Sequence, residues 1–252
     1  MVPIVSLSEI DSEHFGIRVA RAPEVTDDTL PAVLDYCAAN RVVLLIARCS
    51  ASDLRAAQAM ERRGFALMDT LVYYTRDLER APVPSAGSAV AVRPLRPGEA
   101  QVVTGIAGAT FRGYAGHYHA DPRLDRTQCD EGYVSWASRS CVDPAVADAV
   151  LVAESESDIV GFVTLRMRTA NEGEGVLFGV KPAAQGKGVG RSLMIGGMEW
   201  CASRGATTMV ISTQLVNVAV QKVWSRLGFE LARAHYTFHG WFDGASGPPT
   251  VA

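Results

Sequence analysis

The order of apolar and polar residues along the chain predicts an α/β protein. Apolar runs of about four to eight residues alternate with longer segments of helical periodicity, which is typical of strands followed by helices. The clearest example is TTMVISTQL, residues 207–215, which reads as a strand. It is followed by NVAVQKVWSRLGF, residues 217–229, which reads as a helix that ends at Gly228.

The same reading places further elements in the second half of the chain. Residues 149–155 and 158–169 form a predicted hairpin that turns near Glu156 and Asp158. The other predicted strands cover 89–95, 174–182 and 235–242, and the other predicted helices cover 98–111, 130–141 and 190–205. Residues 112–125, RGYAGHYHADPRLD, read as a polar loop rich in aromatic residues.

A change in composition divides the chain. Residues 81–88, APVPSAGS, are typical of a linker because proline, glycine, serine and alanine replace the periodic pattern. We therefore expect a smaller α/β domain at residues 1–80 and a larger one at residues 89–243. Residues 244–252 read as a disordered tail.

The two halves contain a possible repeat. Residues 42–67 align without gaps on residues 206–231, so that Gly64-Phe65 falls on Gly228-Phe229. The N-terminal domain is then a partial, degenerate copy of the C-terminal half. The alternative is that any strand–helix–strand unit that ends in Gly-Phe would align this well.

Composition and charge narrow the function classes. The net charge of −3, without a run of Lys and Arg, does not favour binding to nucleic acid or to an anionic membrane. The N-terminal residues lack the layout of a signal peptide, so we expect a cytoplasmic protein. The five cysteines are scattered and odd in number, which favours reduced thiols.

A glycine-rich turn carries the strongest chemical signal. Gly186, Gly188 and Gly190 alternate with Lys187 and Val189 where a predicted strand gives way to a helix. The first N–H groups of a helix have no intrahelical acceptor, and glycines let an anion approach them closely. The turn therefore predicts a phosphate or pyrophosphate site, and the alternative is a tight connector without a ligand.

The spacing within this turn separates the known nucleotide motifs. A P-loop needs Ser or Thr after its lysine, and here Gly188 follows Lys187. The spacing also differs from G-x-G-x-x-G. The pattern that fits is Q-x-x-G-x-G, formed by Gln185, Gly188 and Gly190.

With this pattern the chain resembles the GCN5-related N-acetyltransferases (GNAT family) from about residue 90 to 242. The resemblance implies their acyl-CoA N-acyltransferase fold, a mixed and mostly antiparallel sheet flanked by helices, with a degenerate GNAT-like domain before it. It implies acetyl-CoA as co-substrate and no metal. The expected CoA-binding residues are Phe178, Gly179, Val180, Gln185, Gly186, Lys187, Gly188, Val189, Gly190, Arg191, Ser192 and Asn217.

The resemblance also exposes a departure in the catalytic residues. The family usually has a tyrosine seven residues after the Asn as the acid for the leaving thiolate, and here that position is Trp224. An indole N–H can donate a hydrogen bond but is too weak an acid to transfer a proton. Tyr236 or Ser225 could substitute, or the chain could lack activity. Trp224 could equally be a core residue. A main-chain N–H at Gly179 or Val180 would polarise the thioester.

Acidic residues before residue 175 are candidates for the base that accepts the proton of the amine. Glu174, with Glu172 beside it, precedes the strand at which acceptors bind in the family. Both could equally be solvated loop acids, and a water relay could replace them.

The HYHAD segment has three interpretations. Tyr114, His117, Tyr118 and His119 could bind the acceptor by stacking and hydrogen bonds, or they could be a polar connector. A metal site of His117, His119 and Asp121 is disfavoured because Pro122 stands where a further His would be needed. His14-Phe15-Gly16 more plausibly turns the chain into a first strand than contacts the acceptor.

A narrower resemblance covers nearly the whole chain. Residues 9–22, the GFALMDTLVYYTRDL segment and HYHADPRL look like acetyltransferases of the dTDP-fucosamine type, which modify a 4-amino sugar on thymidine diphosphate. The implied function is acetyl transfer to a nucleotide-linked amino sugar by direct attack. The alternatives are another amine, such as an aminoglycoside, polyamine or protein amine, and a non-catalytic acyl-CoA-binding protein. The expected partner is a small-molecule amine, with a homodimer possible.

Overall fold

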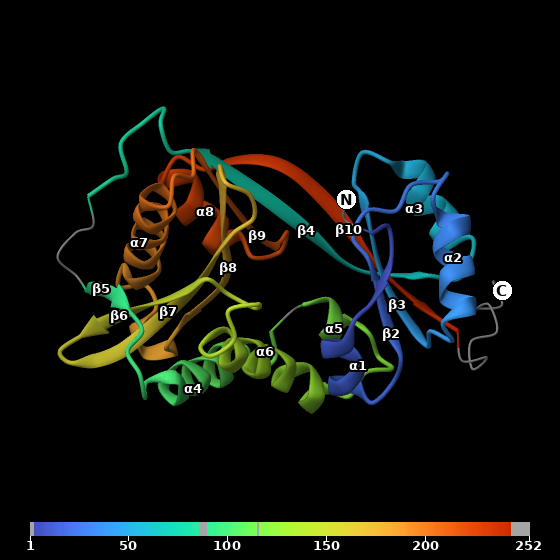
Figure 1. The fold of residues 1–252 in the computed structure, drawn as a ribbon, viewed down its shortest axis with the longest axis horizontal. Helices are drawn as coiled ribbons and strands as arrows, with labels where there is room; N and C mark the ends of the chain where they lie inside the picture. Colours follow the sequence, from blue (N-terminus) through green and yellow to red (C-terminus); the bar gives the residue numbers. More distant parts are fainter. Residues whose placement is uncertain (1–2, 86–89, 115, 243–252) are drawn as a thin grey trace. The chain divides into compact units, whose positions relative to one another are not determined.

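The computed structural model describes residues 3–85, 90–114 and 116–242. The chain forms two compact units that interleave in sequence. The first contains residues 1–72, 115–128 and 233–252, and the second contains 73–114 and 129–232. The chain passes between the units inside two long strands, β4 (Ala66–Asp77) and β10 (Glu230–Trp241) (Figure 1).

The expected domains at residues 1–80 and 89–243 follow the chain in sequence, whereas the compact units do not. Strand β10 returns from the second unit to pair with the first one, so the last described residues of the chain complete the N-terminal unit. Part of the expected linker at 81–88 and all of the expected tail at 244–252 lie outside the described residues.

The first unit is a sheet covered by helices. Its strands follow the order β1-β2-β3-β10, in which β2 and β3 are parallel and β3 and β10 are antiparallel. The elements besides β4 and β10 are β1 (Ser6–Leu7), α1 (Glu9–Phe15), β2 (Val19–Ala22), α2 (Leu30–Ala39), β3 (Leu44–Ser50), α3 (Leu54–Glu61) and α5 (His117–Ala120).

The core of the first unit lies on one face of this sheet. Alternate β3 residues Leu45, Ala47 and Cys49 are fully buried with Met60 of α3 and Phe238 of β10. Side chains alternate between the two faces of a strand, so residues 235, 237, 239 and 241 of β10 lie on the face opposite to Phe238. That face carries the polar cluster described below.

The second unit is a mixed sheet between helices. Its strands follow the order β9-β8-β7-β6-β5, antiparallel except for the parallel pair β8 and β9. Helix α7 packs against all five strands, and α4 packs against β7 and β8 (Figure 1). The elements are β5 (Ala91–Pro94), α4 (Ala100–Thr110), α6 (Arg126–Ser140), β6 (Ala149–Ser155), β7 (Asp158–Met167), β8 (Glu172–Val180), a 3₁₀ turn η1 (Pro182–Ala184), α7 (Val189–Ser203), β9 (Thr208–Gln214) and α8 (Val218–Arg226).

The predicted elements of the second half are confirmed in type and order, with different bounds. The last strand begins at Glu230 rather than at residue 235, and residues 117–120 of the predicted loop form the short helix α5. The segment before Gly16 forms α1, which ends because Gly16 adopts a left-handed conformation at φ 65°.

The two aligned segments have the same local structure. Both contain a strand, a helix and a strand, β3-α3-β4 and β9-α8-β10. Asp53 and Asn217 occupy equivalent N-cap positions, and Gly64 and Gly228 have φ values of 77° and 82°. This agreement supports the proposed repeat. Across the described ranges, no helix is long and apolar enough to cross a membrane.

Candidate acyl-CoA site

The central feature of the second unit is the separation of two parallel strands. β8 and β9 pair from Glu172 and Thr208 as far as Gly175 and Ile211. Both strands continue beyond that point, β8 to Val180 and β9 to Gln214, without a further pair between these described residues. The last residues of β8 therefore have an open edge where β9 would otherwise bond.

Hydrogen bonds around Val180 show which groups face this edge. The N–H of Lys181 donates to the carbonyl of Val160 on β7 at 2.8 Å. Because bonding alternates along an antiparallel pair, the main-chain groups of Val180 point away from β7. The Val180 carbonyl accordingly accepts bonds from Thr110 Oγ1 and Gln185 Nε2, both at 3.2 Å.

The same alternation excludes one predicted role for Gly179. Its N–H faces β7, so of the two residues expected to polarise a thioester only Val180 has an N–H on the open edge. Phe178, two residues earlier, also has its main-chain groups on that edge. Glycine is needed at position 179 for packing, because an added Cβ would lie 2.3 Å from a ring carbon of Phe162.

The glycine turn presents main-chain donors without acceptors. The N–H of Ser192 bonds to the Gly188 carbonyl at 3.0 Å and begins the regular bonding of α7. In the described structure, the N–H groups from Gly186 to Arg191 donate to no protein acceptor. These groups lie at the positive end of a helix of 15 residues, which favours an anion.

Two of the three glycines are required by the backbone. Gly186 and Gly188 have φ values of 74° and 84°, which residues with a Cβ rarely adopt. Gly190 is different, because its φ is not in that region and an added Cβ would meet nothing within 4 Å. The fold therefore does not explain the glycine at 190, whereas close approach of a ligand would.

Charged side chains flank the turn. Lys187 and Arg191 are exposed, and Arg191 donates to the carbonyl of Ser85 at 3.3 Å. Gln185 is also exposed, and its side chain returns to Val180, so the turn is tied to the end of β8.

Helix α8 contributes the residues expected near the thioester. Asn217 caps the helix, and its side chain donates to Thr213 Oγ1 at 3.0 Å. Trp224 is 4% exposed and packs edge-on against Tyr74, with ring centroids 5.6 Å apart. Tyr74 in turn donates its hydroxyl hydrogen to Gln221 at 3.2 Å.

Tyr114 lies at the end of β9. Its hydroxyl donates to Oε1 of Gln214, the last residue of that strand. The ring contacts Phe111 and Tyr133 edge-on, with both centroid distances at 5.4 Å. Tyr114 therefore belongs to the second unit, while His117, Tyr118 and His119 belong to the first.

Two of those three residues are committed to a buried network in the first unit. His117 Nδ1 lies 3.0 Å from His239 Nε2, and His239 Nδ1 lies 2.6 Å from Asp121. Trp241 Nε1 also donates to Asp121, at 3.0 Å. Tyr118 donates its hydroxyl hydrogen to Asp11 at 2.8 Å.

Burial controls the protonation of this network. It lowers the pKa of His117 well below the usual value, and electrostatic interactions with His239, Arg48, Arg21 and His119 lower it further. Burial alone would raise the pKa of Asp121, but hydrogen bonds from His239, the Arg123 N–H and Trp241 outweigh it, so the pKa is lowered. His117 is therefore neutral and Asp121 is ionised at neutral pH.

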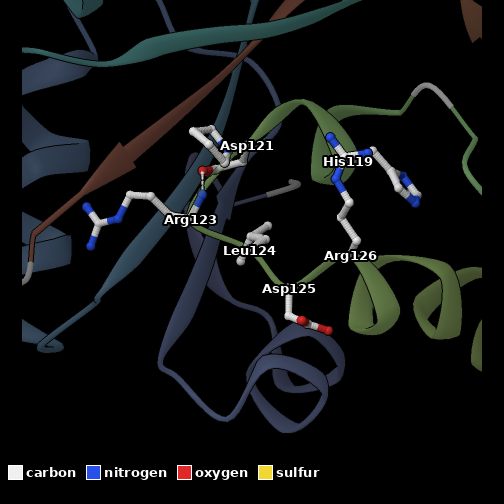
Figure 2. A pocket seen from close by; sticks show the side chains of 7 residues that line it. His119, Asp121, Arg123, Leu124, Asp125 and Arg126 are labelled. Atoms are coloured by element: carbon white, nitrogen blue, oxygen red, sulfur yellow. Dashed lines mark hydrogen bonds between the residues drawn. The ribbon is translucent and has the colours of Figure 1, made fainter.

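His119 lines a cavity of about 490 Å³ in the first unit, shown in Figure 2 with its side chain next to that of Arg126. The other lining residues are Asp121, Pro122, Arg123, Leu124 and Asp125. In the part of the chain that is described, no three His, Cys, Asp or Glu side chains are grouped to hold a metal ion.

The other two predicted catalytic residues are Tyr236, in the first unit, and Glu174, in the second. Tyr236 packs against the core of the first unit and lines a cavity of about 250 Å³ with residues of α3. Glu174 lies on the paired part of β8, beside Val210 and 3.7 Å from Arg168. Six residues of extended strand separate it from Val180, about 20 Å at about 3.3 Å per residue. The structure thus does not bring Glu174 to the open edge.

Sequence reasoning missed Thr110, Gln214 and Tyr74. Each contacts a predicted site residue only through the tertiary fold, and no local pattern marks any of them. The predicted reduced cysteines are confirmed, since all five are free thiols. Burial raises the pKa of Cys37 to about 11 and that of Cys201 to about 12, so neither is a reactive thiolate at neutral pH.

Comparisons with known proteins agree with this geometry. A sequence profile for the acetyltransferase (GNAT) family matches residues 114–229. The spore coat polysaccharide biosynthesis protein SpsD of Bacillus subtilis (strain 168) is 25% identical over 150 residues, which cover 59% of this chain and 50% of that protein. A mycothiol acetyltransferase of Streptomyces bingchenggensis (strain BCW-1) is 32% identical over 149 residues, which cover 59% and 45%.

The chain spans about half the length of these curated relatives. A crystal structure of a GCN5-related N-acetyltransferase from Sphaerobacter thermophilus has the same fold, with a TM-score of 0.64 and 16% identity over 94% of this chain and 76% of that one. The narrower resemblance to acetyltransferases of the dTDP-fucosamine type stays a prediction. Residues 114–229 match the sequence profile of the acetyltransferase (GNAT) family, and the chain has the GNAT fold.

Proposed function

We propose that this protein is an acetyl-CoA-dependent N-acetyltransferase that moves the acetyl group directly to a primary amine. The observation that carries the proposal is the run of unbonded N–H groups from Gly186 to Arg191, beside the open edge of β8. A tight connector without a ligand would leave these donors to water alone. Such a connector would also not require β8 and β9 to separate beside it.

In the proposed complex, different residues of the second unit bind different parts of CoA. The N–H groups of the turn and the charge of Lys187 hold the diphosphate, with Gln185 and Ser192 at its margins, whereas Asn217 belongs with the residues of α8 near the thioester. The main-chain groups of Phe178 pair with the amide-bearing arm of CoA along the open edge of β8. Acetyl-CoA supplies an acetyl group activated as a thioester.

Val180 is the residue that activates the reaction. Its N–H faces the open edge and donates to the thioester carbonyl, which becomes more negative as the amine attacks. The Thr110 hydroxyl and the Gln185 amide hold the end of β8 in place through the Val180 carbonyl. A fixed donor of this kind typically contributes about 3 kcal/mol to the barrier reduction.

For the acceptor, we propose a nucleotide-linked amino sugar. A relative named for polysaccharide biosynthesis is compatible with a sugar, whereas the mycothiol acetyltransferases are named for a different acceptor. In the second unit, Tyr114 retains an accessible surface for stacking on or hydrogen bonding to the acceptor. His117 and Tyr118 support this role less well, because both are held in the buried network.

A screen for released thiol tests the function. The full chain is incubated with acetyl-CoA and a panel of nucleotide-linked amino sugars, aminoglycosides, polyamines and peptide amines. Turnover with an amino sugar at a kcat/KM at least about tenfold above the other amines supports the proposal. Turnover with another amine would refute the sugar as acceptor. Tight CoA binding without turnover on the panel would indicate a non-catalytic acyl-CoA-binding protein.

A further inference from the structure

Helix α4 and the turn after it are bonded to both of the separated strands. Thr110 Oγ1 donates to the Val180 carbonyl at the end of β8, and the Tyr114 hydroxyl donates to Gln214 at the end of β9. Thr110 is the last residue of α4, and the N–H of Tyr114 bonds to the Phe111 carbonyl in the following turn, at 3.0 Å. One short segment therefore spans the opening between the strands.

This connection places a phenol opposite the main-chain donor of β8. The Val180 N–H faces the opening from the end of β8, and the Tyr114 hydroxyl is bonded to the side chain of Gln214, the last residue of β9. A thioester bound through its carbonyl to Val180 has its sulfur one bond from the carbonyl carbon. The proposed complex then directs this sulfur toward the end of β9, where the Tyr114 hydroxyl is bonded to Gln214.

The chemistry of the proposed reaction needs an acid at that point. A thiol has a pKa of about 8.5, so the departing thiolate is stabilised by protonation, and a tyrosine with a pKa of about 10 can supply the proton. Trp224 cannot, because its indole N–H does not ionise in the accessible pH range. Ser225 is exposed on α8, and Tyr236 packs against the core of the first unit.

We propose that Tyr114 is the proton donor to the CoA sulfur, an inference that rests on the proposed acetyltransferase function. As the amine attacks and the C–S bond breaks, the bonding electron pair moves to sulfur. The phenol proton transfers to that sulfur and gives a thiol and a phenolate. The proton released by the amine returns to the phenolate through solvent, so the enzyme ends each cycle unchanged.

Gln214 acts as the positioning residue for this transfer. Its carboxamide is buried at the end of β9 and holds the Tyr114 oxygen. If the amide is turned, its NH₂ group donates to the same oxygen, and this orientation stabilises the phenolate after the proton has left. The stacked rings of Phe111 and Tyr133, with centroids 4.8 Å apart, fix the Tyr114 ring from the other side.

Tyr74 is the rival phenol. Its ring contacts Trp224, but its hydroxyl donates to Gln221 on α8 rather than to a group at the ends of β8 or β9. The two phenols can be distinguished by removing one hydroxyl at a time. Tyr133→Phe is the matched control, because it removes a hydroxyl from the same aromatic cluster as Tyr114.

The test measures the thiol itself rather than turnover. CoA and desulfo-CoA complexes of the full chain are titrated with base, and the difference in ultraviolet absorbance reports ionisation of the bound thiol. A phenol that donates to the thiolate lowers the thiol pKa. Tyr114→Phe should therefore raise the pKa of the bound thiol by about one unit relative to wild type, while Tyr74→Phe and Tyr133→Phe leave it unchanged.

Calorimetry with CoA separates the possible failures. If wild type and Tyr114→Phe bind CoA equally but have the same thiol pKa, the inference about Tyr114 is wrong and the proposed function stands. A raised thiol pKa in Tyr74→Phe alone would assign the acid to Tyr74. If the wild-type chain does not bind CoA, both the inference and the proposed function are wrong.

Turnover gives a second readout. Loss of a general acid typically costs about 10²-fold or more in rate. Tyr114→Phe should lower kcat by about 10²-fold with little change in KM for acetyl-CoA, and it should remove the solvent deuterium isotope effect on kcat. An isotope effect retained in full would overturn the role.

Discussion

Gly175 and Ile211 are the last paired residues of β8 and β9, and the ring of Phe178 lies over Gly175. A Cβ added to Gly175 would be 2.9 Å from a ring carbon of Phe178 and 3.1 Å from Cγ2 of Ile211. The ring thus fills the space above Gly175 at the point where the strands part. Phe178 was predicted as a CoA-binding residue through its main chain, and its side chain has this additional structural position.

Substitution at this point should cost stability. Gly175→Ala should lower the free energy of unfolding by about 1–3 kcal/mol, because the new methyl group overlaps the Phe178 ring. Combining it with Phe178→Leu should recover part of the loss. Urea denaturation measures both effects. Gly190→Ala is the control, since its Cβ meets nothing within 4 Å and alanine favours a helix. Equal stability of Gly175→Ala and wild type would contradict this packing.

The tryptophan at position 224 gives a second prediction. Trp224→Tyr places an acidic hydroxyl on the face of α8 that Asn217 and Gln221 share. We expect turnover to stay equal or rise, and we expect it to recover part of the activity lost in Tyr114→Phe. The smaller ring leaves space beside Tyr74, so stability should fall by about 1–3 kcal/mol. Steady-state kinetics with acetyl-CoA tests this. A large fall in kcat of the single variant would mean that the indole itself is required.

The buried network predicts how stability depends on pH. Because the pKa of His117 is lowered on folding, the unfolded chain takes up this proton more readily than the folded one. The stabilising contribution is therefore complete above pH of about 6.5, the unfolded value, and decreases as the pH falls below it. The limiting slope is about 1.4 kcal/mol per pH unit for one proton.

Measurements of the free energy of unfolding between pH 5 and 8 would detect the uptake of about one proton on unfolding. His117→Gln should be less stable than wild type at pH 8, and its stability should fall less steeply below pH of about 6.5. The groups that lower the pKa of His117 are His239, Arg48, Arg21 and His119. The dependence of the free energy of unfolding on pH that remains in His117→Gln comes from other titrating groups. The same slope in both proteins would show that His117 is already charged in the folded state.

Local patterns in the sequence were sufficient for the elements of the second unit and for the glycine turn. The strand before the turn, the helix after it and the left-handed glycines all follow from short-range rules. The length of β10 was underestimated, because residues 230–234, ELARA, have no apolar alternation and are extended only through tertiary pairing. The helix α5 was missed because HYHA has no helical periodicity.

The site was predictable only where a motif carries it. The main-chain N–H donors from Gly186 to Arg191 are adjacent in sequence, so the motif alone predicted that they lie together. Thr110 and Val180 are 70 residues apart, and Tyr114 and Gln214 are 100 apart, so only the fold brings them together. Glu174 shows the opposite case: it is close in sequence to the open edge but lies on the paired part of β8, because an extended strand separates residues in space.

Binding of acetyl-CoA to the glycine turn is the most direct test of the account. Gly190→Glu puts a negative side chain at the first turn of α7, where the fold has room for it and the diphosphate should bind. Gly105→Glu makes the same change at an exposed position of α4 where a Cβ also meets nothing. In calorimetry, the account predicts that Gly190→Glu binds acetyl-CoA at least about 10²-fold more weakly than wild type, a loss of about 2.7 kcal/mol, while Gly105→Glu binds normally. Equal affinity in wild type and a folded Gly190→Glu variant would contradict it.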